Sequence, residues 1–455
     1  MRATPRLVGD EITSMCLDGA ERQYLDFDFA ASTGALASVA DAVTAFLPFY
    51  SSVHRGAGYK SIASSAAYES ARQAVFSFAR REGRDDVVIL VRNTTEAINH
   101  LAYRLRLQPS DVVVTSVVEH HANLLPWGRV ATRRMIECDE RGTFSLEAVV
   151  TVLDAVPKAK LLAITGASNV TGWLPPIDAI ITAAHERGVP VLLDAAQLAP
   201  HRSLPSGADF VVFSGHKMYA PFGCGALIGP RSSFLEGDPF LVGGGAVDLV
   251  DLDEVIWTAP PEREEAGSPN VIGAVALHAA IDELSDIGFE AIGAHDDLVA
   301  HALRAGLKSI DQVRLLGPDL ETPTLPVASF TIEGVSHALA AARLSAEFGI
   351  GVRHGCFCAH PYLVRLLGMR GASLKTFRSM ARAGERASLP GAVRASGGLT
   401  TTLDDVDRLL RAVREIATTP APASYVKDDR NGEWWPGGLP RPDDGMGLLP
   451  GCGAT

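Results

Sequence analysis

The sequence predicts an α/β fold with a mainly parallel sheet. Short apolar runs rich in Val, Ile and Leu alternate with helical patterns through most of the chain up to Val271. These runs are continuously apolar, which is typical of strands that a parallel sheet buries on both faces. The expected strands are residues 87–91, 111–116, 161–165, 191–194 and 209–214, and two of the intervening helices are residues 95–105 and 180–187.

Beyond Val271 the pattern indicates a second, smaller α+β domain. A long helical pattern at 272–287 could link two domains, strand patterns follow at 327–332 and 352–353, and a helical pattern covers 403–416. A chain of this length can hold two or three domains. We therefore expect two domains with a further segment at each end. They are an N-terminal segment that joins the small domain (1–30), a large domain (31–275), a small C-terminal domain (276–417) and a Pro- and Gly-rich tail (418–455). The tail should be mostly irregular, although Trp434 and Trp435 suggest that part of it docks on an apolar surface.

Composition and charge exclude several classes of protein. With 455 residues, of which 47% are hydrophobic and 21% charged, the chain can bury a large core. A net charge of −12 argues against nucleic acid as the main partner, because phosphate binding needs clustered Lys and Arg. The sequence has no apolar run of the roughly 18–20 residues that cross a bilayer, and it begins without the layout of a secretory signal. Six cysteines do not make a disulfide framework, so we expect a cytoplasmic protein.

The strongest local signal is a lysine at the end of an apolar strand. Residues 209–214 are followed by Gly215, His216 and Lys217, and then by a Gly-rich stretch at 221–225. Ligands of open α/β sheets bind at the carboxyl ends of the strands. A lysine placed there among small residues can form an imine with an aldehyde cofactor such as pyridoxal 5′-phosphate (PLP). An ordinary surface lysine after a strand is the alternative.

A carboxylate ends a second apolar strand. Asp194 closes the run 191–194, and Gln197 follows three residues later. Packing explains this position poorly, whereas PLP needs a carboxylate that keeps its ring nitrogen protonated. Gln197 could donate to the phenolic oxygen of the ring. A strand-end Asp that caps the next helix is the alternative.

Hydroxyl-bearing residues mark a strand-to-helix turn. Thr94 and Thr95 precede a helical pattern whose free N–H groups and positive end suit the phosphate of the cofactor. Ser214 and His216 would complete this phosphate site. A plain Thr N-cap with the nearby Glu96 explains the turn equally well in isolation.

Two adjacent histidines follow Glu119. His120 and His121 could suggest a metal, but neighbouring side chains on a strand point apart, and no spaced Asp or Glu completes a site. An imidazole stacked on the cofactor ring is the better functional interpretation.

Four features thus occur along the chain in the order phosphate turn, stacking histidine, aspartate and lysine. In these features and their order, the chain resembles a known family. It is similar to class V aminotransferases, above all to the SUF-type (group II) cysteine desulfurases and selenocysteine lyases. The resemblance runs from about Tyr24 to about Val413. The segments that carry it include Val53-His54-Arg55-Gly56, Thr94-Thr95-Glu96, Glu119-His120-His121-Ala122-Asn123, Ser168-Asn169, Asp194-Ala195-Ala196-Gln197, Phe213-Ser214-Gly215-His216-Lys217, Glu265-Ala266-Gly267-Ser268 and Val393-Arg394.

This resemblance implies the aspartate-aminotransferase-like fold of PLP enzymes (fold type I), with a seven-stranded sheet in the large, PLP-binding domain. It also implies a role for each matching residue. Lys217 would hold PLP and take part in catalysis, with His121 stacked on the ring, Asp194 at the ring nitrogen, and Asn169 and Gln197 beside the ring. Thr94, Thr95, Ser214 and His216 would hold the phosphate. The substrate would lie against Arg394, Arg353, Ala31 and His54. Ser268 would reach the phosphate of a neighbouring subunit, which implies a homodimer.

Residues 354–358, which we call the thiol segment, match the family pattern only in part. Cys358 occupies the position that carries a persulfide in the family, but the residues before it are His354-Gly355-Cys356-Phe357 where the family usually has Thr-Gly-His-His. The Cys-Phe-Cys pattern resembles the sulfurase domain of molybdenum cofactor sulfurases. Extra length at 371–392 and the segment 397–402 also depart from the family near the expected substrate entrance. Cys356 could relay sulfur, form a disulfide with Cys358, or pack.

The resemblance therefore implies a cysteine desulfurase. The enzyme would convert L-cysteine to alanine and pass the sulfur from Cys358 to an acceptor protein. The alternatives are a same-fold PLP enzyme with other chemistry, namely a C–S lyase, an epimerase or an aminotransferase, and a non-enzymatic scaffold. We expect no metal at His354, Cys356, Cys358 and His360, because a zinc site would need a second, distant pair of ligands.

Overall fold

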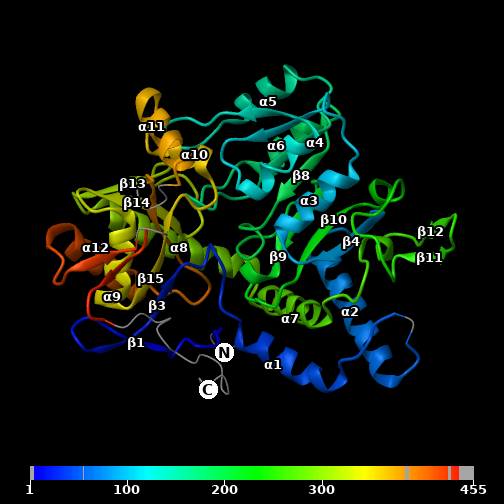
Figure 1. Ribbon diagram of the computed structural model, residues 1–455, viewed down its shortest axis with the longest axis horizontal. Coiled ribbons are helices and arrows are strands. Elements are labelled where there is room, and N and C mark those ends of the chain that lie inside the picture. Colours follow the sequence, from blue (N-terminus) through cyan, green and yellow to red (C-terminus); the bar gives the residue numbers. More distant parts are fainter. Residues whose placement is uncertain (1–4, 55, 385–388, 429–431, 440–455) are drawn as a thin grey trace.

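The computed structural model describes residues 5–54, 56–384, 389–428 and 432–439. It contains two main sheets, each with its own helices (Figure 1). Arg55 of the matched segment 53–56, the first four residues of the predicted segment 1–30, part of the predicted extra length at 371–392, and residues 440–455 of the tail lie outside the described residues. None of the helices in the described ranges is long and apolar enough to cross a membrane.

The larger sheet has seven strands in the order β4-β10-β9-β8-β7-β5-β6. Its strands are β4 (Asp86–Val91), β5 (Val112–Ser116), β6 (Thr132–Ile136), β7 (Leu161–Thr165), β8 (Val191–Asp194), β9 (Phe210–Ser214) and β10 (Gly225–Pro230). The pairs from β9 to β6 are parallel, and β10 is antiparallel to both β4 and β9. The central strands β7, β8 and β9 are buried throughout, as their continuous apolar sequences require. This confirms the predicted α/β class and the seven-stranded, mainly parallel sheet.

Helices cover this sheet on both faces (Figure 1). They are α1 (Ala37–Phe46), α2 (Tyr59–Phe78), α3 (Thr94–Arg104), α4 (Trp127–Val130), α5 (Leu146–Asp154), α6 (Ile177–His185) and α7 (Val271–Ile287). Short 3-10 turns lie at Leu47–Phe49, His121–Asn123, Gly215–Lys217, Arg231–Phe234 and Glu262–Glu264. The strands β11 (Val247–Val250) and β12 (Val255–Trp257) form a hairpin that projects from the body.

The smaller sheet has five strands in the order β13-β14-β16-β15-β3. They are β3 (Leu25–Phe27), β13 (Val313–Leu316), β14 (Val327–Ile332), β15 (Ile350–Gly355) and β16 (Ala392–Ser396). The N-terminal strand β3 pairs in parallel with β15, so the start of the chain belongs to the small unit. The helices α8 (Phe289–Lys308), α9 (His337–Phe348) and α12 (Leu403–Thr418) enclose a core around Phe330, Val393 and Leu409. A short pair, β1 (Thr13–Met15) and β2 (Glu21–Gln23), precedes β3.

The helix predicted at 272–287 as a link between the two domains is α7, and it ends just before Gly288; the predicted boundary between 275 and 276 stays a prediction. Helix α7 continues to Ile287 and packs on α1 and α2, whereas α8 packs on β13, β14 and α12. Gly288 separates the two helices with a φ of 89°, a conformation that glycine adopts without strain.

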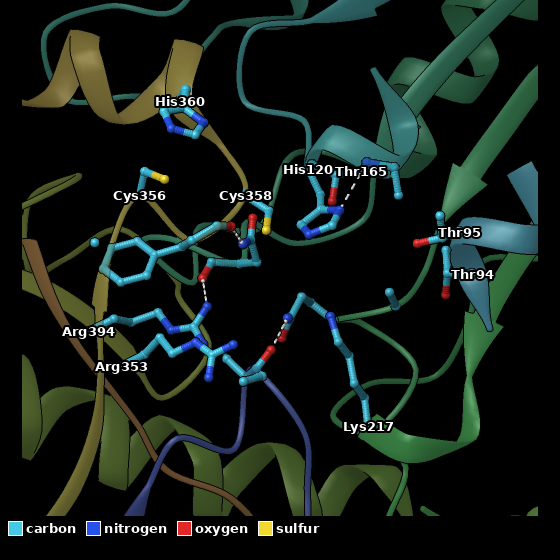
Figure 2. Close-up of a pocket in the computed structure, with 18 of the residues that line it drawn as sticks. Thr94, Thr95, His120, Thr165, Lys217, Arg353, Cys356, Cys358, His360 and Arg394 are labelled. Atoms are coloured by element: carbon cyan, nitrogen blue, oxygen red, sulfur yellow. Dashed lines mark hydrogen bonds between the residues drawn. The ribbon is translucent and has the colours of Figure 1, made fainter. Parts of the chain in front are cut away.

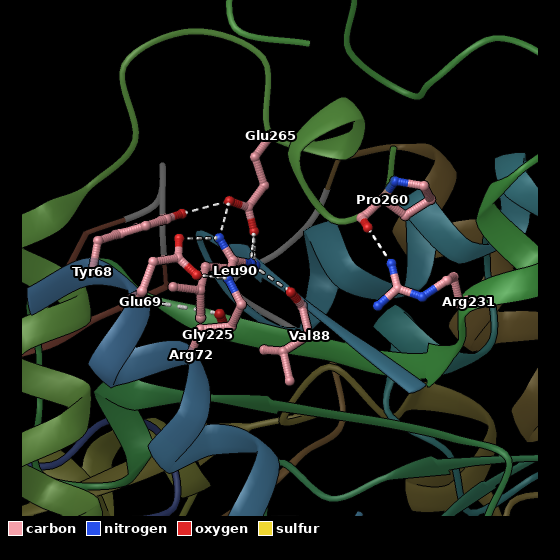
Figure 3. A network of polar contacts seen from close by, with 10 residues as sticks. Tyr68, Glu69, Arg72, Val88, Leu90, Gly225, Arg231, Pro260 and Glu265 are labelled. Carbon is pink, nitrogen blue, oxygen red and sulfur yellow. Dashed lines mark hydrogen bonds and ion pairs between the residues drawn. The ribbon is translucent and has the colours of Figure 1, made fainter. Parts of the chain in front are cut away.

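A buried polar network fixes the segment that precedes α7 (Figure 3). The carboxylate of Glu265 accepts hydrogen bonds from the hydroxyl of Tyr68 (2.8 Å), from two guanidinium nitrogens of Arg72 (2.8 and 2.9 Å) and from the backbone N–H of Leu90 (2.6 Å). Arg72 also donates to the carbonyl oxygen of Val88. Helix α2, strand β4 and the segment that carries Ser268 are thereby held together.

The C-terminal parts contain more structure than expected. Helices α10 (His360–Leu366) and α11 (Gly371–Arg382) lie between the thiol segment and β16. The tail, predicted to be mostly irregular, forms an antiparallel pair of β17 (Tyr425–Lys427) and β18 (Trp434–Pro436) that packs on α9. The hydroxyl of Tyr425 donates to Glu347 at 2.7 Å. Trp434 and Trp435 are only half-buried.

Candidate active site

A cavity of about 520 Å³ lies between the two units, at the carboxyl ends of the parallel strands. Thr165, Asp194 and Ser214, the last residues of β7, β8 and β9, line its floor. Arg353 of β15 and Arg394 of β16 line it from the small unit (Figure 2). The volume is that of an ordinary small-molecule site, and its position is the one expected for a ligand of an open α/β sheet.

Lys217 enters this cavity from the turn that follows β9. Burial lowers the pKa of its ammonium group to about 8, and the attraction of Asp194 only partly opposes this shift. A substantial fraction of Lys217 is therefore neutral near pH 8. A neutral amine is the form that attacks an aldehyde and accepts a proton.

Asp194 is buried at the end of β8 and faces the same cavity. Its Oδ1 atom accepts the backbone N–H of Ala196 at 3.0 Å. Burial raises the pKa of this carboxyl group, and the positive charge of Lys217 opposes the shift. Gln197 also lines the cavity, and its Nε2 atom donates to the carbonyl oxygen of Ala30 at 2.7 Å. The structure thus brings Asp194, Gln197 and Lys217 together, as the sequence predicts.

The N-terminus of α3 forms one wall of the cavity. The side chain of Asn93 caps the helix by accepting the N–H of Glu96, and the N–H of Thr94 donates to the hydroxyl of Ser214 at 2.7 Å. The hydroxyls of Thr94 and Ser214 lie 2.6 Å apart. Thr95 and His216 line the same end. Hydroxyls gathered at a helix N-terminus suit a phosphate group.

The two adjacent histidines require a correction. His120, not His121, lines the cavity, and burial lowers its pKa to about 3, with a further contribution from Lys217. The Nδ1 atom of His120 accepts the N–H of Ala122 at 3.0 Å. The ring of His121 instead stacks on His360, with centroids 5.0 Å apart. Neighbouring side chains project in different directions, and the sequence motif alone does not tell which of the two faces inward.

The thiol segment lies across the cavity from the helix terminus (Figure 2). Cys358 is exposed and Cys356 half-buried, and both line the cavity. Phe357 and Cys358 both adopt a φ of 53°, a strained conformation for residues with a side chain. Two hydrogen bonds hold this turn, from Asn169 Nδ2 to the carbonyl of Phe357 (2.7 Å) and from the N–H of His121 to the carbonyl of Cys358 (2.8 Å).

Two arginines from neighbouring strands complete the wall. Arg394 is buried and donates to the carbonyl of Asn169 (2.9 Å) and to Asp28 (3.0 Å). Its Nε atom is buried without a hydrogen-bond partner among the described residues. Arg353 is more exposed and forms an ion pair with Asp28 at 3.4 Å. The guanidinium of Arg394 lies 5.1 Å from the ring centre of Phe357, so it borders the thiol segment directly.

Some predicted residues do not reach this cavity within one chain. Ser268 and His54 are exposed and lie outside its lining, whereas Ala31 lines it. The sequence did not reveal Thr165 and the tail residue Gly432, which line the cavity, or Asp28, which pairs with Arg353 and Arg394 at its wall. A strand-end carboxylate could have revealed Asp28, as it revealed Asp194. The described residues contain no cluster of His, Cys, Asp or Glu suited to a metal.

The residues present fit PLP. One end of the cavity offers hydroxyls and a helix N-terminus, the floor offers a buried carboxylate, and a lysine with a lowered pKa lies beside it. The Nε atom of Arg394, buried and without a partner in the part of the chain that the structure describes, adds a donor for an anionic substrate group.

Comparison with known proteins shows consistent similarities. Residues 24–409 match the family model described as aminotransferase class-V. A probable cysteine desulfurase from Vibrio cholerae is 35% identical over 412 residues, which cover 88% of this chain and 94% of that protein. A cysteine desulfurase from Dickeya dadantii is 34% identical over 89% of this chain and 94% of its own length. Among solved structures, a cysteine desulfurase from Thermococcus onnurineus matches with a TM-score of 0.77 and 30% identity, over 87% of this chain and 94% of the other.

Proposed function

The chain belongs to the aminotransferase class-V family, and from this premise we propose that it is a PLP-dependent cysteine desulfurase. It takes the sulfur of L-cysteine onto Cys358 as a persulfide and releases alanine. One observation carries the proposal: Lys217, Asp194 and the thiol of Cys358 open onto a single cavity that two arginines close. The relatives and solved structures named above support the same activity.

PLP is the cofactor of this family. Different residues of this chain would bind its aldehyde carbon, its ring and its phosphate. Lys217 would carry the aldehyde carbon, and Asp194 would pair with the ring nitrogen. Thr94, Thr95, Ser214 and His216 would hold the phosphate, while Asn169 and Gln197 would flank the ring. His120, which lines the cavity, would lie beside the ring in the role that the resemblance implied for His121. When bound, PLP supplies an electron sink that weakens the bonds at the α-carbon of an amino acid.

The chain itself orients the substrate and moves protons. Arg394 would bind the carboxylate of L-cysteine, because its guanidinium is buried at the cavity wall with Nε free to donate. Lys217, as a neutral amine, would accept the proton of the α-carbon. The Cys358 thiolate would then attack the substrate sulfur. The new S–S bond forms as the carbon–sulfur bond breaks, and the carbon takes up a proton to give alanine.

A homodimer is part of the proposal. Ser268 and His54, which are exposed and outside the cavity of their own chain, would serve the cavity of the partner. The apolar side chains needed for such an interface are exposed after α1, at the start of α2, and in and before the β11–β12 hairpin. They include Leu47, Phe49, Tyr50, Tyr59, Ile62, Leu241, Val242, Leu249, Val250 and Leu252. Sedimentation of the purified protein tests this, and a monomer that is fully active would contradict it.

The activity is tested by product analysis. PLP-loaded protein is incubated with L-cysteine and dithiothreitol beside the Cys358→Ala variant. We expect alanine and sulfide in equal amounts from the wild-type protein and neither from the variant. Formation of pyruvate and ammonia would show a C–S lyase instead. We propose the cytoplasm as the location, since the reducing environment there keeps thiols such as Cys358 free.

A further inference from the structure

Helix α11, in the extra length between the thiol segment and β16, presents a basic surface. Lys375, Arg378 and Arg382 are spaced so that they share one face of the helix, and all three are exposed. None of them lies within ion-pair distance of a carboxylate of the described residues, whereas Arg370 at the start of the helix pairs with Glu140. We call Lys375, Arg378 and Arg382 the α11 basic face.

The opposite face of α11 rests on the thiol segment. Leu374, Phe377 and Met380 are half-buried, and the ring of Phe377 lies 6.0 Å from the ring of His360. Phe377 and His360 also line a small hollow together with Cys356. Figure 1 shows α11 beside α10, on the side of the molecule away from the β11–β12 hairpin. Helix α11 therefore packs beside the segment that carries Cys356 and Cys358, while its basic face is exposed to solvent.

The charge of this face is opposite to that of the chain as a whole. The protein carries a net charge of −12, yet residues 371–382 contain three basic residues and no Asp or Glu. Exposed Arg353 adds a further positive charge at the cavity wall. A local positive field beside a reactive group attracts partners of opposite charge and raises their rate of encounter.

We propose that the α11 basic face binds an acidic sulfur acceptor, a protein whose receiving cysteine is surrounded by Asp and Glu. This inference rests on the proposed desulfurase function and names the kind of partner that function requires. The acceptor thiolate attacks the outer sulfur of the Cys358 persulfide. An S–S bond forms on the acceptor as the Cys358 S–S bond breaks, and Cys358 leaves as a thiol with the acceptor's proton. The exchange needs no added oxidant or reductant.

Charged peptides test the inference on the PLP-loaded protein. Radiolabelled L-cysteine first places sulfur on Cys358, and the peptides Glu-Glu-Cys-Glu-Glu and Lys-Lys-Cys-Lys-Lys then compete for it. We expect the acidic peptide to take sulfur about 10-fold faster at low salt, with the difference shrinking at high salt because exposed charges are screened. The triple variant Lys375→Gln, Arg378→Gln and Arg382→Gln should lose most of this preference.

A matched control removes the same charge elsewhere. Lys308, Arg411 and Arg414 are exposed on α8 and α12, and their replacement by Gln should leave the preference intact. Alanine formation with dithiothreitol and the thermal midpoint should be unchanged in both triple variants. Equal rates for the two peptides, or a preference that survives in the α11 variant, would overturn the inference. Absence of persulfide in the wild-type protein would instead count against the desulfurase function.

Discussion

The backbone N–H of His121 donates to the carbonyl oxygen of Cys358 over 2.8 Å. The ring of the same histidine accepts, at Nε2, the backbone N–H of His360 over 3.2 Å, and it stacks on the His360 ring. His121 thus holds the chain at Cys358, which carries the proposed persulfide, and at His360 two residues later. The residue expected at the cofactor ring is therefore bound to the thiol segment.

This geometry separates the roles of the two adjacent histidines. His121→Ala should lower alanine formation about 10-fold, because a loosened thiol misses the alignment that catalysis needs, while PLP affinity stays near wild type. His120→Ala should weaken PLP binding, since His120 lines the cavity beside Lys217. Turnover and PLP dissociation constants measured for both variants check this. If His121→Ala were the variant that lost PLP, the assignment made from the structure would be wrong.

Lys217 should make the stability of the cofactor-free protein depend on pH. Its pKa is lowered from 10.5 to about 8 in the fold, so the unfolded chain binds more protons between these two values. The penalty on folding is therefore fully present below pH 8 and fades as the pH rises towards 10.5. Lys217→Met should raise the thermal midpoint at pH 7 relative to the wild type, and the gain should shrink above pH 8. A gain that did not vary with pH would show that Lys217 is not the group responsible.

The two cysteines of the thiol segment should behave differently. Cys356 is half-buried, and burial raises the pKa of its thiol, so little thiolate forms at neutral pH. Cys358 is exposed at the cavity. Cys356→Ser should therefore keep alanine formation within about 3-fold, whereas Cys358→Ser should lose more than about 100-fold. Mass spectrometry of the protein after reaction with L-cysteine should find the extra sulfur on Cys358. Its appearance on Cys356 would favour a relay.

The sequence predicted those parts of the site that a single strand end defines. Asp194 and Lys217 each follow or close a continuous apolar run, and a polar residue in that position belongs on the carboxyl edge of a parallel sheet. Residues that depend on contacts between the two units were not predictable in this way. Asp28 meets Arg394 only because β3 joins the small sheet beside β15, and Gly432 reaches the cavity only because β18 packs on α9. The choice between His120 and His121 depended on the backbone turn, which local sequence does not specify.

Glu265 should be essential to stability although it lies outside the cavity. Its carboxylate accepts hydrogen bonds from the hydroxyl of Tyr68, the N–H of Leu90 and both terminal nitrogens of Arg72 (Figure 3). Arg72 is itself buried. Glu265→Ala leaves the Arg72 charge buried without its main partner, a change that usually lowers the free energy of unfolding by about 3–5 kcal/mol. Urea unfolding followed by fluorescence measures the loss. The double variant Arg72→Met and Glu265→Leu removes both charges and should recover much of the stability, because the buried charge is then gone. Ser268 follows Glu265 by three residues, so Glu265→Ala should also weaken the proposed homodimer and the proposed contact of Ser268 with the PLP phosphate. A variant that lost stability but kept full PLP affinity in a dimer would show that Ser268 is positioned by other contacts.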